Sequence, residues 1–244
     1  MIDSFELGHL KVSRGSAALL LDRVVSNIKS RKKIGCIPIN VTKYCMSKSD
    51  LKLATCIKNS GLVLADGMPI VWLGKRLGST DVHRITGVAF TESLMSRAAV
   101  EGLTLYFFGS TQRNLDAAMK SISSEFTNIK IVGYRNGYYD DDDISSIISD
   151  INEVKPDILI LGLGLPQKEY FMHDYFPALD VKFCITVGGA IDIWSGSKKR
   201  APKFIQKIGM EWLFRSLYDL SRAYLIVTFG FAFLKDLLFL TKKH

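Results

Sequence analysis

The sequence lacks an uncharged apolar run of the ~20 residues that a helix needs to cross a bilayer. The apolar stretch near its end, residues 223–234, is interrupted by Lys235 and Asp236. The first residues, MIDSFELGHLKVSRGS, also lack the basic and then apolar pattern of a secretory signal peptide. These absences favour a cytoplasmic protein without a simple membrane span.

Cysteine and histidine are scarce, with 4 of each in 244 residues. They form no Cys-x-x-Cys pair and show no ligand spacing: Cys36, Cys45, Cys56, Cys184, His9, His83, His173 and His244. Structural zinc sites place such ligands at short, regular spacings. We therefore expect reduced, mostly buried thiols and no bound metal.

Two common nucleotide-binding motifs are missing. The chain has no GxxxxGK[ST] sequence, so ATP hydrolysis is not indicated, and neither GLGLPQ nor VGGAID completes GxGxxG. Glycines nevertheless end three strand-like runs, at Gly109, at Gly162 with Gly164, and at Gly188 with Gly189. Glycine lets the backbone approach a ligand closely, and the following helix offers free N–H groups to phosphate oxygens. The turns therefore favour a phosphate-bearing nucleotide.

Acidic residues are outnumbered, 24 against 32 lysines and arginines, which gives a formal net charge of +8. Such a charge favours an anionic partner: a nucleic acid, a phosphorylated ligand or an acidic membrane surface. The basic residues are dispersed and the aromatic ones cluster in the apolar tail, whereas nucleic-acid binders interleave the two. We expect no nucleic-acid partner.

Strand-like and helix-like segments alternate along most of the chain. Apolar runs such as IGCIPIN, LTLYFFGST and DILILGLGLP are typical of buried strands, and helical patterns lie between them. This alternation predicts an α/β fold, a Rossmann-like, mostly parallel sheet with flanking helices. We expect one α/β domain over residues 1–200 and a C-terminal helical appendage over residues 201–244.

The appendage is helical, basic and aromatic in pattern and ends in AYLIVTFGFAFLKDLLFLTKKH. It could be a buried helix, a transmembrane span, or a helix lying in the membrane interface. A span over residues 223–240 would bury Lys235 and Asp236 at a cost of several kcal/mol. An interfacial helix places both charges at the headgroups and turns neighbouring basic residues toward anionic lipid. The pattern therefore favours a membrane-associating helix in the interface.

An aspartate directly follows one buried apolar run, in LVLADGMPIVW. Asp66 and Gly67 are common turn residues, but open α/β sheets bind ligands outside the carboxyl ends of their strands, so a turn and a site are both open. Arg84 follows in HRITG, and arginine is the best bidentate partner for a diphosphate. The acidic run at residues 140–143 is interpreted as capping the next helix and not as a metal site.

Four segments together resemble one family in order and spacing: ADGMPIVW, HRITGVAF, ILGLGLPQKEYF and VGGAIDIWSGSKKRAPKFIQKIGMEWLFR. They are similar to the WecB/TagA/CpsF glycosyltransferases, glycosyltransferase family 26, across residues 34–222. The resemblance implies transfer of a sugar from a UDP-sugar to a polyprenyl-diphosphate-linked saccharide, with inversion, in bacterial cell-surface or exopolysaccharide synthesis. It implies no metal or other cofactor, and a peripheral location on the inner face of the cytoplasmic membrane.

The resemblance also implies roles for individual residues. Asp66 falls on the family's proposed general base, Gly67 on the turn beneath the sugar, and Arg84 on the group that faces the diphosphate. Further donor- or acceptor-site residues follow from the same resemblance: Asn40, Gln167, Glu169, Gly188, Gly189, Asp192, Arg200 and Arg215. Gly109 joins them as a strand-end glycine turn.

Some of these residues have more specific expected contacts. Gln167 and Glu169 are expected to hold sugar or ribose hydroxyls. Arg200 and Arg215 would approach a diphosphate when the appendage closes over the site. Asn40 matches a Thr-x-Asn pattern of many members, but Pro38 stands at the threonine position, so a hydroxyl contact is lost there.

Other functions fit parts of the sequence. A nucleotide-sugar hydrolase or epimerase would use the same donor cleft without needing a lipid-facing tail. A non-catalytic, membrane-associated nucleotide-sugar-binding protein would explain the tail but leave Asp66, Arg84 and Gln167 without a role. The sequence leaves open which sugar is transferred and whether the chain forms a homo-oligomer.

Overall fold

The computed structural model describes residues 3–207, 211, 214 and 220–239. Its main sheet has six strands in the order β4-β3-β8-β7-β5-β6, and every neighbouring pair is parallel. The strands are β3 (Ile34–Ile39), β4 (Gly61–Ala65), β5 (Thr104–Gly109), β6 (Lys130–Arg135), β7 (Ile158–Gly162) and β8 (Phe183–Thr186). The predicted α/β fold with a parallel sheet is confirmed.

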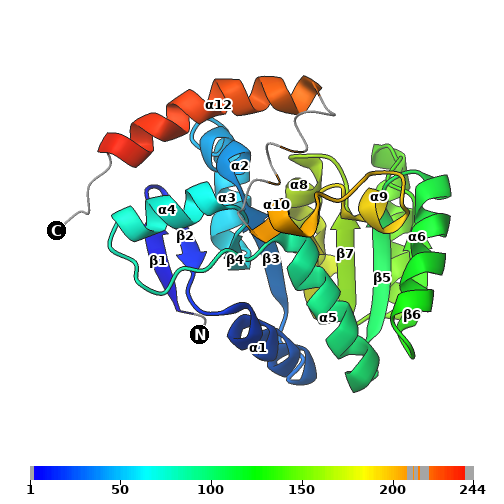
Figure 1. The fold of residues 1–244 in the computed structure, drawn as a ribbon. Coiled ribbons are helices and arrows are strands. Elements are labelled where there is room, and N and C mark those ends of the chain that lie inside the picture. Colours follow the sequence, from blue (N-terminus) through cyan, green and yellow to red (C-terminus); the bar gives the residue numbers. More distant parts are fainter. Residues whose placement is uncertain (1–2, 208–210, 212–213, 215–219, 240–244) are drawn as a thin grey trace.

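Helices cover both faces of the sheet (Figure 1). One core lies under α1 (Ala17–Lys29), α5 (Gly87–Glu101), α6 (Gln112–Glu125) and α9 (Ala190–Trp194). The other lies under α2 (Val41–Met46), α3 (Leu51–Asn59), α4 (Met68–Arg76), α7 (Ile144–Val154) and α8 (Gln167–Tyr175). Successive strand residues alternate between these cores, so that Ile160 of β7 enters the first and Leu161 the second. Both faces are apolar, as expected for a parallel sheet.

The strand order places a change of winding direction within the sheet. The chain runs outward from β3 to β4 on one side and then crosses to β5 on the other side. Ligands of open α/β sheets bind where the direction of winding changes in this way. The carboxyl ends of β3, β8 and β7 therefore form the expected place for a site.

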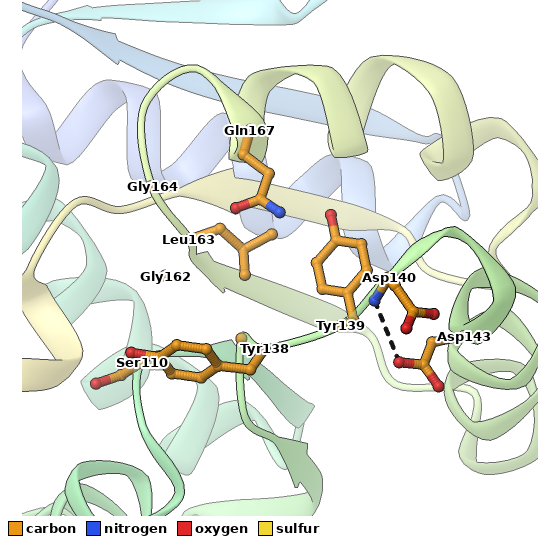
Figure 2. A pocket seen from close by; sticks show the side chains of 10 residues that line it. Ser110, Tyr138, Tyr139, Asp140, Asp143, Gly162, Leu163, Gly164 and Gln167 are labelled. Atoms are coloured by element: carbon orange, nitrogen blue, oxygen red, sulfur yellow. Dashed lines mark hydrogen bonds between the residues drawn. The ribbon is translucent and has the colours of Figure 1, made fainter.

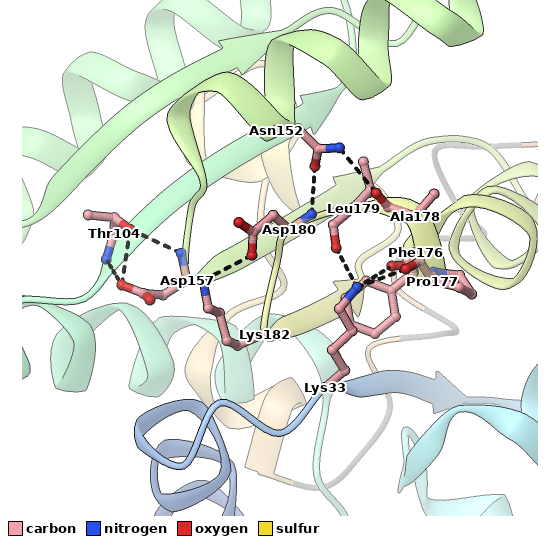
Figure 3. Close-up of polar contacts among 10 residues, drawn as sticks. All are labelled: Lys33, Thr104, Asn152, Asp157, Phe176, Pro177, Ala178, Leu179, Asp180 and Lys182. Atoms are coloured by element: carbon pink, nitrogen blue, oxygen red, sulfur yellow. Dashed lines mark hydrogen bonds and ion pairs between the residues drawn. The ribbon is translucent and has the colours of Figure 1, made fainter.

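The opposite, amino-terminal edge is held by local polar contacts (Figure 3). Lys33 precedes β3, and its Nζ donates to the backbone carbonyls of Pro177 (2.9 Å) and Leu179 (2.5 Å) near η2 (Phe176–Ala178). The Asp157 carboxylate accepts hydrogen bonds from N and Oγ1 of Thr104, both at 3.0 Å, and so joins the starts of β7 and β5. The charged groups at this edge stabilise the sheet.

A small second sheet was not predicted from the sequence. The strands β1 (Ser4–Leu7) and β2 (Leu10–Ser13) form an antiparallel hairpin. Its turn requires Gly8, where φ is +60° and a Cβ would lie 2.7 Å from Oη of Tyr44. The Ser13 hydroxyl accepts a hydrogen bond of 3.0 Å from a backbone N–H of β4. The hairpin thus protects the edge strand of the main sheet.

The C-terminal helix α12 (Leu220–Phe239) packs across α2 and α4 (Figure 1). Phe233 is buried, with its ring edge-on to Tyr44 at a centroid distance of 5.6 Å. Asp236 forms an ion pair with Lys48, and its side chain is only 15% exposed. The prediction that Asp236 faces lipid headgroups is therefore wrong, because the ammonium group holds it against α2. Within the described part of the chain, no helix is long and apolar enough to cross a membrane.

Candidate active site

Asp66 lies where β4 ends, beside the end of β3. Its backbone N–H donates to the carbonyl of Ile39 (2.8 Å), and Gly67 turns the chain at a φ of +130°. The half-buried carboxylate points toward the start of α5, since a Cβ on Gly87 would lie 3.9 Å from its Oδ2. The turn therefore fixes a carboxylate at the edge of the sheet where ligands bind.

Arg84 lies in the loop that leads into α5 and is half-buried. Its Nη1 donates to the backbone carbonyl of Gln206 (2.6 Å) in α10 (Lys203–Lys207). Its Nη2 lies 3.2 Å from Oε2 of Glu211. The structure thus joins this predicted diphosphate-binding residue to the start of the appendage.

Asn40 and Glu169 have structural partners. Asn40 is the N-cap of α2, and its Oδ1 accepts a hydrogen bond from N of Lys43 (3.0 Å). The side chain of Glu169 is 0% exposed and pairs with Nζ of Lys43 (2.8 Å) and of Lys168 (3.4 Å). Lys43 also donates to the carbonyl of Pro38 (2.7 Å). The structure therefore places Glu169 in a buried ion pair, contrary to the expectation that it contacts sugar or ribose hydroxyls.

A cavity of about 660 Å³ opens where β5, β6 and β7 end (Figure 2). It is lined by Ser110, Gly137, Tyr138, Tyr139, Asp140, Asp143, Gly162, Leu163, Gly164 and Gln167. The predicted residue Gln167 is the first residue of α8, and its amide group lies toward the Tyr139 hydroxyl. Burial raises the pKa of Tyr139, and a hydrogen bond with Gln167 partly offsets this effect. The cavity combines aromatic rings with polar groups, which suits a nucleoside.

Glycine is required at the base of this cavity. At Gly109, φ is +147° and a Cβ would lie 2.4 Å from the carbonyl group of Gly162. At Gly137 a Cβ would lie 2.8 Å from a methyl group of Leu163. The strand-end glycines thus bring neighbouring backbones together, whereas Gly188 has open space where a side chain would point.

Asp192 lies in α9, whose N-cap is Gly189, and faces the end of β5. Its carboxylate accepts hydrogen bonds from Oγ of Ser110 (2.5 Å) and Nδ2 of Asn114 (3.2 Å) and pairs with Nζ of Lys198 (2.7 Å). Burial alone would raise the pKa of Asp192, but the hydrogen bonds from Lys198 and Ser110 outweigh it and lower the pKa below its ordinary value. Asp192 therefore carries a negative charge beside the cavity.

Arg200 and Arg215 were expected to approach a diphosphate when the appendage closes over the site. Arg200 donates from Nη1 to both carboxylate oxygens of Glu92, at 2.7 and 2.9 Å, and Trp194 donates to the same carboxylate at 3.2 Å. Arg200 is thus fixed to α5. Arg215 lies outside the described residues.

The acidic run caps a helix, as interpreted from the sequence. Residues Asp141–Asp143 form the short helix η1, and α7 follows directly from Asp143. The Asp143 carboxylate accepts a hydrogen bond from the backbone N of Asp140 (3.3 Å). Among the described residues, no group of three or more histidine, cysteine, aspartate or glutamate side chains could hold a metal ion.

Several site residues were not predicted. Ser110 follows the predicted glycine turn directly, and Tyr138 and Tyr139 follow the strand-like run IKIVGYR, so their positions after strands could have indicated them. Lys43 gave no such signal, because its partner Glu169 is distant in the sequence.

Comparison with known proteins decides the family. Residues 5–243 match the sequence profile of the family described as "Glycosyl transferase WecG/TagA/CpsF family". The chain belongs to this family. The resemblance noted in the sequence is thereby confirmed over nearly the whole chain.

Three similar relatives share one name, N-acetylglucosaminyldiphosphoundecaprenol N-acetyl-beta-D-mannosaminyltransferase. The protein of Bacillus spizizenii is 28% identical over 68% of this chain, that of Bacillus subtilis (strain 168) 30% over 67%, and that of Staphylococcus aureus (strain MRSA252) 29% over 68%. The matched part covers 64%, 63% and 65% of these relatives' own lengths.

Proposed function

We propose that this protein is an inverting glycosyltransferase that moves a sugar from a UDP-sugar to a polyprenyl-diphosphate-linked saccharide. One observation carries the proposal: in a chain of this family, Asp66 and the cavity lie along the same edge of one parallel sheet. The relatives' names specify an N-acetylglucosaminyl-diphosphoundecaprenol acceptor, so an acceptor of this class is the first to test.

The spacing along the sheet edge suits the proposed donor. Three strand spacings separate β4 from β7, and four separate β4 from β5. At about 4.8 Å per spacing, the cavity lies about 14 to 19 Å from Asp66. An extended UDP-sugar has this order of length. The nucleoside would therefore occupy the cavity, and the sugar would lie near Asp66.

Asp66 would act as the general base of a single displacement. Its carboxylate takes the proton from the acceptor hydroxyl while that oxygen forms a bond to the anomeric carbon of the donor. The bond between the anomeric carbon and the diphosphate oxygen breaks, and UDP leaves with the electron pair. Attack from the face opposite the leaving group inverts the anomeric configuration.

Arg84 would stabilise the negative charge that grows on the leaving diphosphate. The ion pair between Arg84 and Glu211 is consistent with this role, because the guanidinium already pairs with an anionic group. A diphosphate would then bind Arg84 either together with the Glu211 carboxylate or in its place. The appendage would thus respond to donor binding through Arg84.

We also propose that α12 attaches the protein to the inner face of the cytoplasmic membrane. Phe233 faces α2, while Phe231 is 74% exposed and Phe239 73% exposed. Leu234 and Leu238 are also about half exposed on this helix. Such an outward apolar surface in a basic protein suits a helix lying on anionic lipid.

The test of the proposed activity is a glycosyl-transfer assay with the full chain. Radiolabelled UDP-sugars are offered one at a time with a short-chain prenyl-diphosphate-linked N-acetylglucosamine. A labelled lipid-linked product from one donor supports the proposal and names the sugar. Donor consumption without such a product would instead favour a nucleotide-sugar hydrolase or epimerase. UDP binding without any turnover would favour a non-catalytic binding protein.

A further inference from the structure

Ser110 has a backbone conformation that favours glycine. Its φ is +59°, at the turn where β5 leads into α6. Its backbone N donates to the carbonyl of Gly162 (3.3 Å), and its own carbonyl accepts from N of Gly137 (2.8 Å). Glycine could make both hydrogen bonds without the steric cost of a Cβ. A residue held in such a conformation suggests a functional use of its side chain.

The Ser110 hydroxyl has one clear partner. Its Oγ lies 2.5 Å from Oδ1 of Asp192, whose other oxygen is 2.7 Å from Nζ of Lys198. An ionised carboxylate can only accept hydrogen bonds, so the hydroxyl proton of Ser110 belongs to this contact. The oxygen lone pairs remain for a further partner. Ser110 is half-buried and lines the cavity, so a ligand there could reach them.

The surroundings indicate which part of a donor would make this contact. The cavity also presents the exposed ring of Tyr138 and the carboxylates of Asp140 and Asp143. Carboxylates and a lone pair repel phosphate oxygens but accept hydrogen bonds from hydroxyl or N–H groups. Arg84, the expected partner of the diphosphate, follows β4, at the opposite side of the sheet from β5 and β6.

We propose that Ser110 is a specificity-determining residue whose Oγ accepts a hydrogen bond from an N–H or O–H group of the donor's nucleoside. The inference rests on the proposed function, because it requires the cavity to hold UDP. It adds a residue outside the recognised sequence motifs, and it assigns that residue an acceptor role fixed by Asp192.

The experiment measures binding by calorimetry with UDP and three analogues, each of which lacks one hydrogen-bond-donating group of the nucleoside. These are 2′-deoxy-UDP, 3′-deoxy-UDP and 3-methyl-UDP. The native chain should bind one analogue about 3- to 10-fold more weakly than UDP, the effect of one hydrogen bond. Ser110→Gly should bind UDP more weakly by a similar factor and show no further loss with that analogue.

Asn128→Gly is the matched control. Asn128 has a similar φ of +66° but is exposed near the amino-terminal end of β6, so its replacement should leave UDP binding unchanged. If Ser110→Gly distinguishes all three analogues from UDP as the native chain does, Ser110 only positions Asp192 and the inference is overturned. Failure of the native chain to bind UDP would instead overturn the proposed function.

Discussion

Removing the carboxylate of the buried ion pair at the end of the sheet should destabilise the protein more than removing one of its two lysines. Glu169 is 0% exposed and its carboxylate lies between the ammonium groups of Lys43 and Lys168, at 2.8 and 3.4 Å. Glu169→Gln leaves two buried cations without their shared counter-charge. Breaking a buried pair in this way costs about 3–5 kcal/mol of unfolding free energy. In a chain of this size that corresponds to a fall in Tm of about 6–20 °C.

Lys43→Met should cost less. Glu169 keeps Lys168 as a partner in this variant, and the main further loss is the hydrogen bond to the buried carbonyl of Pro38. Leaving that acceptor unsatisfied costs about 1–3 kcal/mol. The methionine side chain also fills much of the volume of the lysine stem.

The two variants are compared by urea unfolding at neutral pH. Lys52→Met is the control, because the pair of Lys52 with Asp174 is partly exposed, with side chains 50% and 33% exposed, and should contribute less than about 1 kcal/mol. Equal destabilisation by Lys43→Met and Glu169→Gln would show that Lys168 does not compensate for the loss of Lys43. A Glu169→Gln variant as stable as the control would show that the buried pair contributes no more than a surface pair.

Two further predictions concern Asp192 and the C-terminal helix. Because the pKa of Asp192 is lowered in the folded state, its pairing with Lys198 stabilises the fold at pH values above the ordinary aspartate pKa of about 3.9. This contribution to stability is lost as the pH falls through the pKa of the folded state. Lys198→Met should therefore lower the free energy of urea unfolding at pH 7, and this loss should shrink as the pH falls below the ordinary aspartate pKa; a loss that does not change with pH would contradict this. Phe231→Glu with Leu234→Glu should weaken sedimentation with anionic vesicles at least about tenfold, since each change removes exposed apolar surface from α12. Val100→Glu, at an apolar residue that is 82% exposed on α5, should bind vesicles like the native chain. Retained binding by the α12 variant would exclude this surface as the anchor.

The local sequence pattern predicted the buried strands of the main sheet. The runs around residues 34–40, 103–111 and 158–162 are strands because their β-branched and aromatic residues fill both cores of a parallel sheet. Gly109 and Gly162, two of the strand-end glycines, lie opposite each other in neighbouring strands, and a Cβ on Gly109 would lie 2.4 Å from the carbonyl group of Gly162, so these positions require glycine. The carboxyl edge could therefore be expected to hold the site.

Elements fixed by tertiary packing carry a weaker local signal. The helix α5 packs apolar residues on several sides, among them Phe90, Leu94 and Met95, so it lacks the one-sided pattern of a surface helix. Partners distant in the sequence, such as Lys43 with Glu169, follow from the strand order, which no local pattern fixes. The same reason explains why Glu169 was expected at a ligand and lies in the interior.

The proposed mechanism depends on Asp66 as the general base of a glycosyl transfer. The transfer assay tests this role by comparing the native chain with Asp66→Asn, with EDTA present, and calorimetry measures UDP binding for both. A positioned base typically contributes ~10²–10⁴-fold, so the variant should lose that factor in kcat while binding UDP with unchanged affinity. Equal transfer by the two proteins would contradict the account and leave Asp66 as a turn residue only.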